Sequence, residues 1–391
     1  MNVLDWCLLA LVGLYALSGY WQGFVTGAFA TLGLLLGGVV GVWAAPVLLG
    51  DAAPSTWVSV GALGVVIVAA TLGQAGFQFL GARIRDRITW QPVRAVDAIG
   101  GAALSALAVL VVAWALGVAV SGTRIGAITP VVRESKILAQ VDRALPLEAS
   151  GLLRGFNNVV GAGFFPRYLE PFAPERIVDV AAGPERLLTD PDVLISEASV
   201  VKIVGENACT GGVEGTGFVY APGRVMTNAH VVAGVTRPEV EIDGQIKVGT
   251  VVHYDPRLDV AVLRVDDSNA PPLAFDIEVK AKDGVAIVGY PQDGPFDVQT
   301  ARVRSLQRLR SPDINNSSVV VREVLALRGL IRPGNSGGPV LTSGGDVAGM
   351  VFAASVTDAD TGYALTASQV ADAASAGANN DIAVATGSCV R

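Results

Sequence analysis

A serine flanked by glycines offers the clearest chemistry in this sequence. It is Ser336, in the stretch RPGNSGGP at residues 332–339. Glycines beside a serine allow a tight turn and a close approach of a reacting carbonyl, with several N–H groups directed at one point. Because a serine hydroxyl is a weak nucleophile on its own, it needs an adjacent base to take its proton. The stretch therefore predicts Ser336 as a nucleophile that works with a histidine.

The chain contains two histidines. His230 lies in TNAHVV at residues 227–232, an apolar run typical of a strand end that enters a short helix. His253 lies in VVHYDP at residues 251–256, where a strand or surface histidine is the simpler interpretation. We favour His230 as the base and keep His253 as an alternative. The sequence also leaves open that Ser336 lies in a glycine-rich hairpin and that His230 is a core residue.

Asp259 is the best candidate for the acid that orients the base. It interrupts an apolar, strand-like run, LDVAVLRV, at residues 258–265. A carboxylate buried without a partner is costly, so we expect Asp259 to have one. Asp255 precedes a proline and is better explained as a turn residue whose side chain accepts hydrogen bonds from local N–H groups.

These motifs together resemble those of the chymotrypsin-like serine proteases, in particular the bacterial trypsin-like branch that includes the HtrA proteases. TNAHVV resembles the histidine motif, DVAVL at residues 259–263 the aspartate motif and GNSGGP at residues 334–339 the serine motif. The chain order His, Asp, Ser is that of chymotrypsin and not that of subtilisin or the α/β-hydrolases. The resemblance covers the last half of the chain and implies two antiparallel β-barrels with the active site between them.

The resemblance assigns a role to each residue. Ser336 would attack the scissile carbonyl, His230 would take and return the proton, and Asp259 would hold the imidazole. The backbone N–H groups around Gly334, Asn335 and Ser336 would form the oxyanion hole. The walls of the primary substrate pocket would come from residues near Leu330 and from Phe352, Ala353 and Ala354, and the stretch GYALT at residues 362–366 would line the binding cleft. No acidic residue stands at these places, so we expect an apolar or small residue before the scissile bond rather than lysine or arginine.

The first third of the chain has the composition of a membrane protein. Apolar residues make up 51% of the whole chain, and the excess is concentrated before residue 121. Four stretches, at residues 3–19, 24–46, 57–81 and 100–121, are long enough to cross a hydrocarbon layer. The first has no basic start and no convincing cleavage site, so we expect a retained helix rather than a signal peptide. The sequence therefore predicts a four-helix transmembrane domain.

The distribution of arginine predicts the orientation. Arg83, Arg85, Arg87 and Arg94 cluster between the third and fourth stretches, and such clusters face the cytoplasm. The amino terminus and everything after residue 121 would then lie outside the cytoplasmic membrane of a bacterium, with the protease domain on the periplasmic side.

Cysteine usage agrees with an extracytoplasmic domain. Cys7 lies in the first apolar stretch, and Cys209 and Cys389 are the remaining cysteines of the chain. In an oxidising compartment we expect these two to form a disulfide that ties the end of the chain to the first strands. The alternative, two unrelated buried thiols, requires a reducing compartment.

Glycines recur every fourth residue in two of the apolar stretches, at Gly19, Gly23 and Gly27 and at Gly33, Gly37 and Gly41. Such faces let helices approach closely, and we expect contacts within the helical domain rather than with a partner. The stretch GYWQGF at residues 19–24 resembles the CvpA (colicin V production) family. A CvpA-like domain joined to a chymotrypsin-like domain resembles the actinobacterial membrane-anchored periplasmic serine proteases. This resemblance implies a role in the cell envelope under acid or oxidative stress.

The predicted organisation is a transmembrane domain at residues 1–121, an extracytoplasmic tether at 122–198 and a protease domain at 199–391. In the tether we expect an amphipathic helix at residues 133–144 and an apolar patch formed by Leu152, Leu153, Phe156, Val159 and Val160. We expect the patch to pack on the protease. Residues 337–391 are too few for a PDZ-like domain after the serine motif, which departs from the HtrA pattern.

Several function classes are excluded. The net charge is −7, with no basic stripe for nucleic acid. No glycine-rich nucleotide loop of the expected form is present, and two separate histidines make no convincing metal site, so we expect catalysis without a cofactor. The partners are then protein or peptide substrates and the lipid bilayer; the sequence does not specify an oligomeric state. A catalytically silent receptor with the protease fold remains the alternative, and a transport activity of the helices is disfavoured because charged residues are lacking inside the predicted spans.

Overall fold

The computed structural model describes residues 1–49, 56–121, 127–145, 172, 175–207, 211–242, 244–315 and 317–389. These residues form two compact units, Met1–Gly117 with Ser135–Ala144, and Val118–Glu134 with Leu145–Arg391. Cys209 and the predicted apolar patch at residues 152–160 lie outside the described residues.

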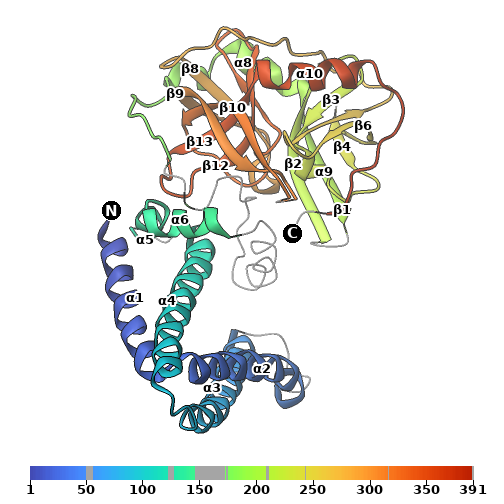
Figure 1. Ribbon diagram of the computed structural model, residues 1–391. Coiled ribbons are helices and arrows are strands. Elements are labelled where there is room, and N and C mark those ends of the chain that lie inside the picture. The colour runs from blue at the N-terminus through green and yellow to red at the C-terminus, as the bar shows by residue number, and fades with distance from the viewer. Residues whose placement is uncertain are drawn as a thin grey trace. The chain divides into compact units, whose positions relative to one another are not determined.

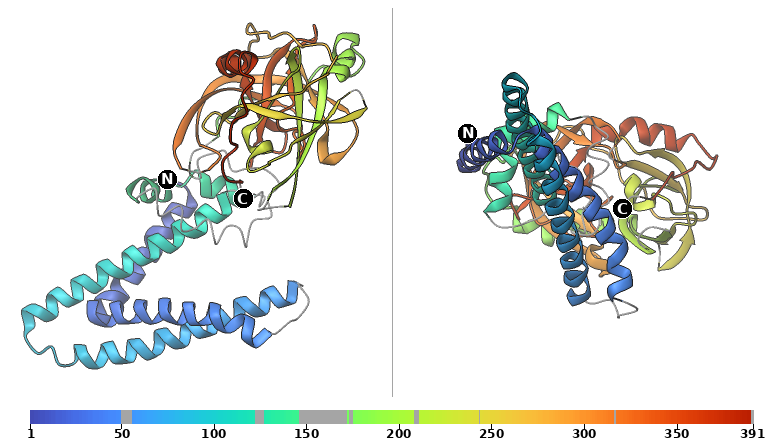
Figure 2. Two further views of the ribbon diagram at one scale, coloured as in Figure 1. Left: turned by 90° about the vertical axis from the view of Figure 1, so that its right-hand side faces the viewer. Right: turned by 60° about the horizontal axis from the view of Figure 1, so that its bottom comes forward.

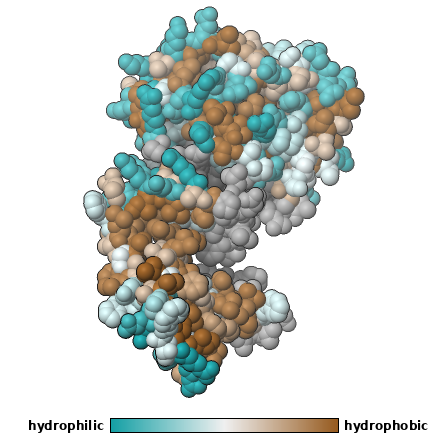
Figure 3. Space-filling view, viewed as in Figure 1, coloured by the Kyte–Doolittle hydropathy of each residue, from teal (hydrophilic) through white to brown (hydrophobic). Residues whose placement is uncertain are grey.

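Four long helices dominate the first unit: α1 (Val3–Gln22), α2 (Phe24–Leu49), α3 (Thr56–Arg85) and α4 (Gln91–Ser121). Each contains a segment long and apolar enough to cross a membrane. The surface of these helices is mainly hydrophobic, while the second unit presents many hydrophilic side chains (Figure 3). The four predicted spans are therefore confirmed, with α3 and α4 extending further toward their shared connection than the apolar stretches alone suggested.

Helices α2 and α3 lie side by side over much of their length (Figure 2). Their backbones meet at the predicted glycine face: a Cβ added to Gly33 would lie 2.3 Å from the carbonyl oxygen of Gly73, and one added to Gly37 would lie 2.3 Å from that of Ala69. No larger side chain fits there without displacing backbone. The expectation that these glycines serve contacts within the helical domain is confirmed.

A partly buried ion pair joins the ends of the helices. Arg85 Nε on α3 is 2.7 Å from Asp97 Oδ2 on α4. The other oxygen of Asp97 accepts the N–H of Val25, at the start of α2. The apolar stretches gave no sign of this pair, because Asp97 lies in the first turns of α4, before the predicted fourth span.

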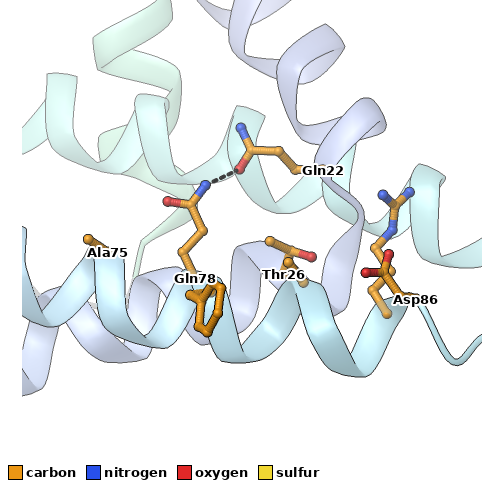
Figure 4. A pocket seen from close by; sticks show the side chains of 8 residues that line it. Gln22, Thr26, Ala75, Gln78 and Asp86 are labelled. Atoms are coloured by element: carbon orange, nitrogen blue, oxygen red, sulfur yellow. Dashed lines mark hydrogen bonds between the residues drawn. The ribbon is translucent and has the colours of Figure 1, made fainter.

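A pocket nearby is lined by eight residues that include Gln22, Thr26, Gln78 and Arg85. The side-chain amide of Gln78 donates a hydrogen bond to that of Gln22 across this pocket, over 3.5 Å (Figure 4).

Two short helices follow α4, α5 (Ile128–Arg133) and α6 (Lys136–Ala144). The carboxylate of Asp5 caps α6, since it accepts from the hydroxyl of Ser135 and from the N–H groups of Lys136 and Ile137. A carboxylate at this place stabilises the helix start. The amphipathic helix predicted at residues 133–144 is thus confirmed from Lys136 onward.

The second unit contains two antiparallel β-structures. The first is a seven-stranded sheet in the order β5-β4-β1-β2-β3-β7-β6. Its strands are β1 (Val200–Asn207), β2 (Gly211–Ala221), β3 (Arg224–Thr227), β4 (Glu239–Ile242), β5 (Gln245–Val248), β6 (Thr250–Asp255) and β7 (Val260–Arg264). The second is a closed barrel in the order β10-β13-β12-β11-β8-β9. Its strands are β8 (Gly284–Gly289), β9 (Asp297–Pro312), β10 (Val319–Arg328), β11 (Pro339–Leu341), β12 (Val347–Ala354) and β13 (Thr361–Thr366). The predicted all-β, two-part architecture is confirmed.

Short helices connect and cover these strands: η1 (Glu185–Leu188), α8 (Pro191–Ile195), η2 (Ser196–Ser199), α9 (Ala229–Val232), η3 (Pro291–Asp293) and α10 (Ala367–Ala378). Helix α10 packs on both β-structures (Figure 1), and a Cβ added to its Gly377 would lie 2.6 Å from the side chain of Val262 on β7. One hydrophobic cluster contains buried side chains from both β-structures, among them Phe218, Met226, Met350 and Phe352. This shared core holds the two β-structures together, and with them the loops between them.

Candidate active site

His230 and Asp259 are in direct contact. His230 Nδ1 is 2.8 Å from Asp259 Oδ2, and the backbone N–H of His230 donates to Asp259 Oδ1 over 2.9 Å. The Asp259 side chain is fully buried, and that of His230 is 11% exposed. An ionised carboxylate can only accept a hydrogen bond, so Nδ1 carries the proton and Nε2 is the nitrogen with a lone pair. The expectation that Asp259 has a partner is confirmed.

A strained turn aims Asp259 at the histidine. Its backbone has a φ of 66°, in the left-handed region that aspartate tolerates better than most residues. Asn228 Nδ2 donates to the carbonyl oxygen of Asp259 over 2.9 Å, which holds the turn from the segment before His230. Asp255 accepts the N–H groups of Arg257 and Leu258, so its predicted role as a turn residue is confirmed.

The second histidine lies elsewhere. His253 belongs to β6, where it is the cross-strand neighbour of Val262 on β7. It is therefore a strand residue, as its apolar flanks predict. Burial raises the pKa of its neighbour Tyr254, and the negative charge of Asp259 raises it further.

The loop that carries Ser336 is held by its own hydrogen bonds. Asn335 Oδ1 accepts the N–H of Arg332, and the N–H of Asn335 donates to the carbonyl oxygen of Arg332 over 3.0 Å. Gly334 has a φ of 90°, and a Cβ there would lie 2.4 Å from the carbonyl oxygen of Tyr290. The loop thus needs glycine at this position for both its conformation and its space.

Two peptide groups of the loop have defined orientations. The carbonyl oxygen of Pro333 accepts the N–H of Gln292 over 2.7 Å, and that of Asn335 accepts the N–H of Gly338 over 2.9 Å. In a trans peptide the N–H points opposite to the carbonyl, so the N–H groups of Gly334 and Ser336 point away from these partners. Within the described part of the chain, neither of these two N–H groups has an acceptor. The loop therefore presents two unused donors, as an oxyanion site requires.

Thr216 on β2 connects this loop to the first β-structure. Its hydroxyl donates to the carbonyl oxygen of Gly334 over 2.6 Å and accepts the N–H of Tyr290. Its N–H donates to the carbonyl oxygen of Ser336 over 2.8 Å, and its own carbonyl oxygen accepts the hydroxyl of Thr227. Thr216 and Thr227 therefore place the serine loop against the segment that leads into His230.

Ser336 and His230 approach each other through their neighbours. A Cβ added to Gly337 would lie 3.0 Å from the backbone nitrogen of Asn228, two residues before His230. The segments that carry Ser336 and His230 are therefore neighbours in the fold.

The predicted pocket residues precede and follow the serine loop along the chain. Phe352, Ala353 and Ala354 belong to β12, and their neighbour Val351 exchanges hydrogen bonds with Gly337 and Gly338. Leu330 precedes the loop and is 43% exposed, whereas Phe352 is fully buried in the core. The ring of Phe352 faces the Arg322 guanidinium at 5.7 Å.

Arg322 is a buried residue that the sequence motifs did not indicate. It lies on β10 and is 0% exposed. Its guanidinium donates to the carbonyl oxygens of Arg257, Leu258 and Pro312 and to the hydroxyl of Ser311. Two of these carbonyls belong to the turn that ends at Asp259. A lone arginine within a strand pattern was the only sequence signal for it.

Comparisons with known proteins find relatives of both parts of the chain. Residues 215–350 match the trypsin-like peptidase domain, and residues 4–146 match the colicin V production protein family. The chain is similar to the serine protease Rv3671c of Mycobacterium tuberculosis, with 36% identity over 99% of this chain and 98% of the relative. It is also similar to a probable periplasmic serine endoprotease DegP-like of Chlamydia pneumoniae, with 32% identity over 35% of this chain and 28% of that protein. The crystal structure of Rv3671c protease in its active form superimposes with a TM-score of 0.55 and 42% identity, covering 57% of this chain and 99% of that one.

Proposed function

Because this chain belongs to the family of the mycobacterial serine protease Rv3671c and is a serine protease with a trypsin-like peptidase domain, we propose that Ser336, His230 and Asp259 form its catalytic triad. The observation that carries this proposal is the pair of hydrogen bonds from His230 to the buried carboxylate of Asp259. They present Nε2 as the proton acceptor, which is the form a general base needs.

In the proposed mechanism, Ser336 Oγ attacks the scissile carbonyl carbon while His230 Nε2 accepts the hydroxyl proton. The carbonyl oxygen becomes negative and receives hydrogen bonds from the N–H groups of Gly334 and Ser336. The C–N bond then breaks, and His230 returns the proton to the leaving amine. Water hydrolyses the acyl-enzyme by the same steps in reverse order, and Asp259 stabilises the imidazolium at each stage.

The chain is a multi-pass membrane protein, and we propose that its protease domain faces the periplasm of a bacterial cytoplasmic membrane. Four basic residues, Arg83, Arg85, Arg87 and Arg94, occupy the α3–α4 connection and its flanks, which is the charge pattern of a cytoplasmic segment. A membrane-impermeant maleimide tests this in intact cells. Arg87→Cys should be protected, and Ser268→Cys, in the loop that follows β7, should react; the reverse pattern would invert the topology.

We further propose that the substrates are proteins of the cell envelope, cleaved under acid or oxidative stress. The reasons are the proposed topology and the absence of an acidic side chain among Leu330, Phe352, Ala353 and Ala354. An apolar or small residue before the scissile bond fits such a site. Peptide libraries with one varied position would test this preference, and a clear preference for lysine or arginine would contradict it.

The alternative function is a catalytically silent receptor that binds peptides in the same cleft. Labelling of the full-length protein with a fluorophosphonate probe separates the two, because only an activated serine reacts. We expect labelling at Ser336 in the wild type, none in Ser336→Ala, and a severe loss in His230→Gln. His253→Gln is the matched control and should label like the wild type. A folded wild-type protein that fails to label would favour the receptor.

A further inference from the structure

A stretch without regular secondary structure, residues 175–183 (the strap), lies along the closed barrel. Three arginines of β9 and β10 donate to its backbone: Arg304 to the carbonyl oxygen of Val178 over 2.7 Å, Arg328 to that of Val180, and Arg302 to that of Ala182 over 3.0 Å. In an extended chain, alternate carbonyls point the same way. The strap is therefore held as an added extended segment, through backbone contacts that depend on three side chains of the barrel.

The first residue of the strap is part of a buried polar cluster. Tyr363 on β13 donates its hydroxyl to Glu175 Oε2 over 2.8 Å, and Glu175 Oε1 is 3.7 Å from Arg133 Nε. The side chains of Arg133 and Glu175 are only 3% and 2% exposed, and Tyr363 is fully buried. Burial raises the pKa of Tyr363, and the charge of Glu175 raises it further, so the phenol remains a donor. Burying such groups is costly unless they are paired.

The strap is connected to the predicted pocket region at two points. Tyr363 is the cross-strand neighbour of Ala353, one of the predicted pocket residues on β12. Arg304, 5% exposed, also lies 3.7 Å from Asp358, in the loop that joins β12 to β13. Tyr363 therefore links the strap to β12 through strand pairing, and Arg304 links it to the loop that follows β12.

These contacts continue to the serine loop. Asp358 accepts the N–H of Asp360 and the hydroxyl of Thr361, and the carbonyl oxygen of Asp360 accepts the N–H of Gly329, next to Leu330. A Cβ added to Gly362 would lie 2.0 Å from the side chain of Ile331. Residues 329–331 run directly into the loop of Ser336, so a shift of β13 or of the β12–β13 loop is transmitted there.

We propose that the strap is a positioning element of the protease, in which Glu175, Tyr363 and Arg304 hold the substrate pocket in its binding geometry. This inference rests on the proposed function, because it concerns the same site. Displacement of a substrate-positioning group by about 1 Å costs roughly a hundredfold in rate. Removing a strap contact should therefore raise KM and lower kcat/KM in protein that is still folded.

The test uses the full-length protein in detergent, with active sites counted by fluorophosphonate titration. Tyr363→Phe removes only the hydroxyl that donates a hydrogen bond to Glu175. Arg304→Met removes the contacts to Val178 and Asp358. Arg308→Met is the matched control, because Arg308 lies on the same strand with a 76% exposed side chain that pairs with Glu323. Thermal unfolding is followed for every variant, and Arg304→Lys and Glu175→Gln provide milder changes where the larger ones do not fold.

We expect Tyr363→Phe and Arg304→Met to raise KM and lower kcat/KM per titrated site by roughly tenfold or more, with Arg304→Lys in between and Arg308→Met like the wild type. A strap with a purely structural role would reduce the number of titrated sites and the unfolding temperature. It would leave KM, and kcat/KM per titrated site, unchanged, and that result would overturn the inference. Wild-type protein that does not label at Ser336 would instead count against the proposed function itself.

Discussion

The hydroxyl of Thr216 donates to the carbonyl oxygen of Gly334 over 2.6 Å, so a strand of the first β-structure holds the loop that carries the serine of the second. The same residue donates its N–H to the carbonyl oxygen of Ser336. Both bonds orient peptide groups rather than side chains. Thr216 thereby holds the Gly334–Asn335 and Ser336–Gly337 peptide groups, which flank the peptide that carries the N–H of Ser336, without contacting a substrate itself.

Thr216→Val should lower kcat/KM by about ten- to a hundredfold, because the peptide groups on both sides of the Asn335–Ser336 peptide lose their anchor on β2 and the oxyanion donors beside them shift. Valine has nearly the shape of threonine but leaves the carbonyl oxygen of Gly334 and the N–H of Tyr290 without a partner, at about 1–3 kcal/mol of stability. Steady-state kinetics on a peptide substrate and chemical denaturation give the two values. Thr216→Ser restores the hydroxyl and should recover most of the activity; equal losses in both variants would contradict this account.

Asp259→Asn should lower kcat by about 10³–10⁴-fold, because the amide no longer holds the imidazole in the tautomer whose Nε2 carries no proton. Asparagine tolerates a positive φ, so the turn should survive. The rate of fluorophosphonate labelling should fall together with kcat. As a control, Asp255→Asn makes the same change in the neighbouring turn and should leave activity close to that of the wild type.

Arg322→Met should lower the free energy of unfolding by about 2–4 kcal/mol, because several buried acceptors lose their donor. Activity should also fall, since the turn before Asp259 and the ring of Phe352 lose a common support. Arg308→Met, on an exposed part of β9, should stay within about 0.5 kcal/mol of the wild type. An Arg322→Met protein with full stability would show that its hydrogen bonds contribute little.

The activity should decrease as the pH falls, because a protonated imidazole has no lone pair with which to accept the proton of Ser336. On the acidic side, kcat/KM should drop by about tenfold for each unit of pH. A pH profile at constant ionic strength measures this. A flat profile down to strongly acidic pH would show that the rate does not depend on a neutral histidine.

Cys209 and Cys389 should form a disulfide in protein purified without reductant. Closing so long a loop contributes up to about 4–5 kcal/mol by restricting the unfolded chain. Cys389→Ser should therefore lower the free energy of unfolding. Peptide mapping by mass spectrometry under non-reducing conditions identifies the bond directly; two alkylated cysteines in the unreduced protein would contradict it.

The amino-acid sequence by itself determined the features that depend on short stretches of chain. Four apolar stretches define the membrane helices because the bilayer excludes polar side chains along their whole length. The stretches around His230, Asp259 and Ser336 identify the candidate residues because each needs a specific local backbone. The glycines of α2 predicted a close helix–helix contact, because helices can approach so closely only where a side chain is missing.

Only the tertiary structure decided how these residues are held. Thr216, Gln292 and Arg322 act mainly on backbone carbonyls and N–H groups, which every residue has, so no residue type marks their partners in the sequence. Glu175 and Tyr363 are distant along the chain, and Asp97, the partner of Arg85, lies at the edge of an apolar run. Neither pair can therefore be identified from the sequence, and only the folded structure shows that the partners meet. Local stretches encode chemical groups and helices, whereas long-range hydrogen bonds, formed after the strands have paired, give those groups their orientation.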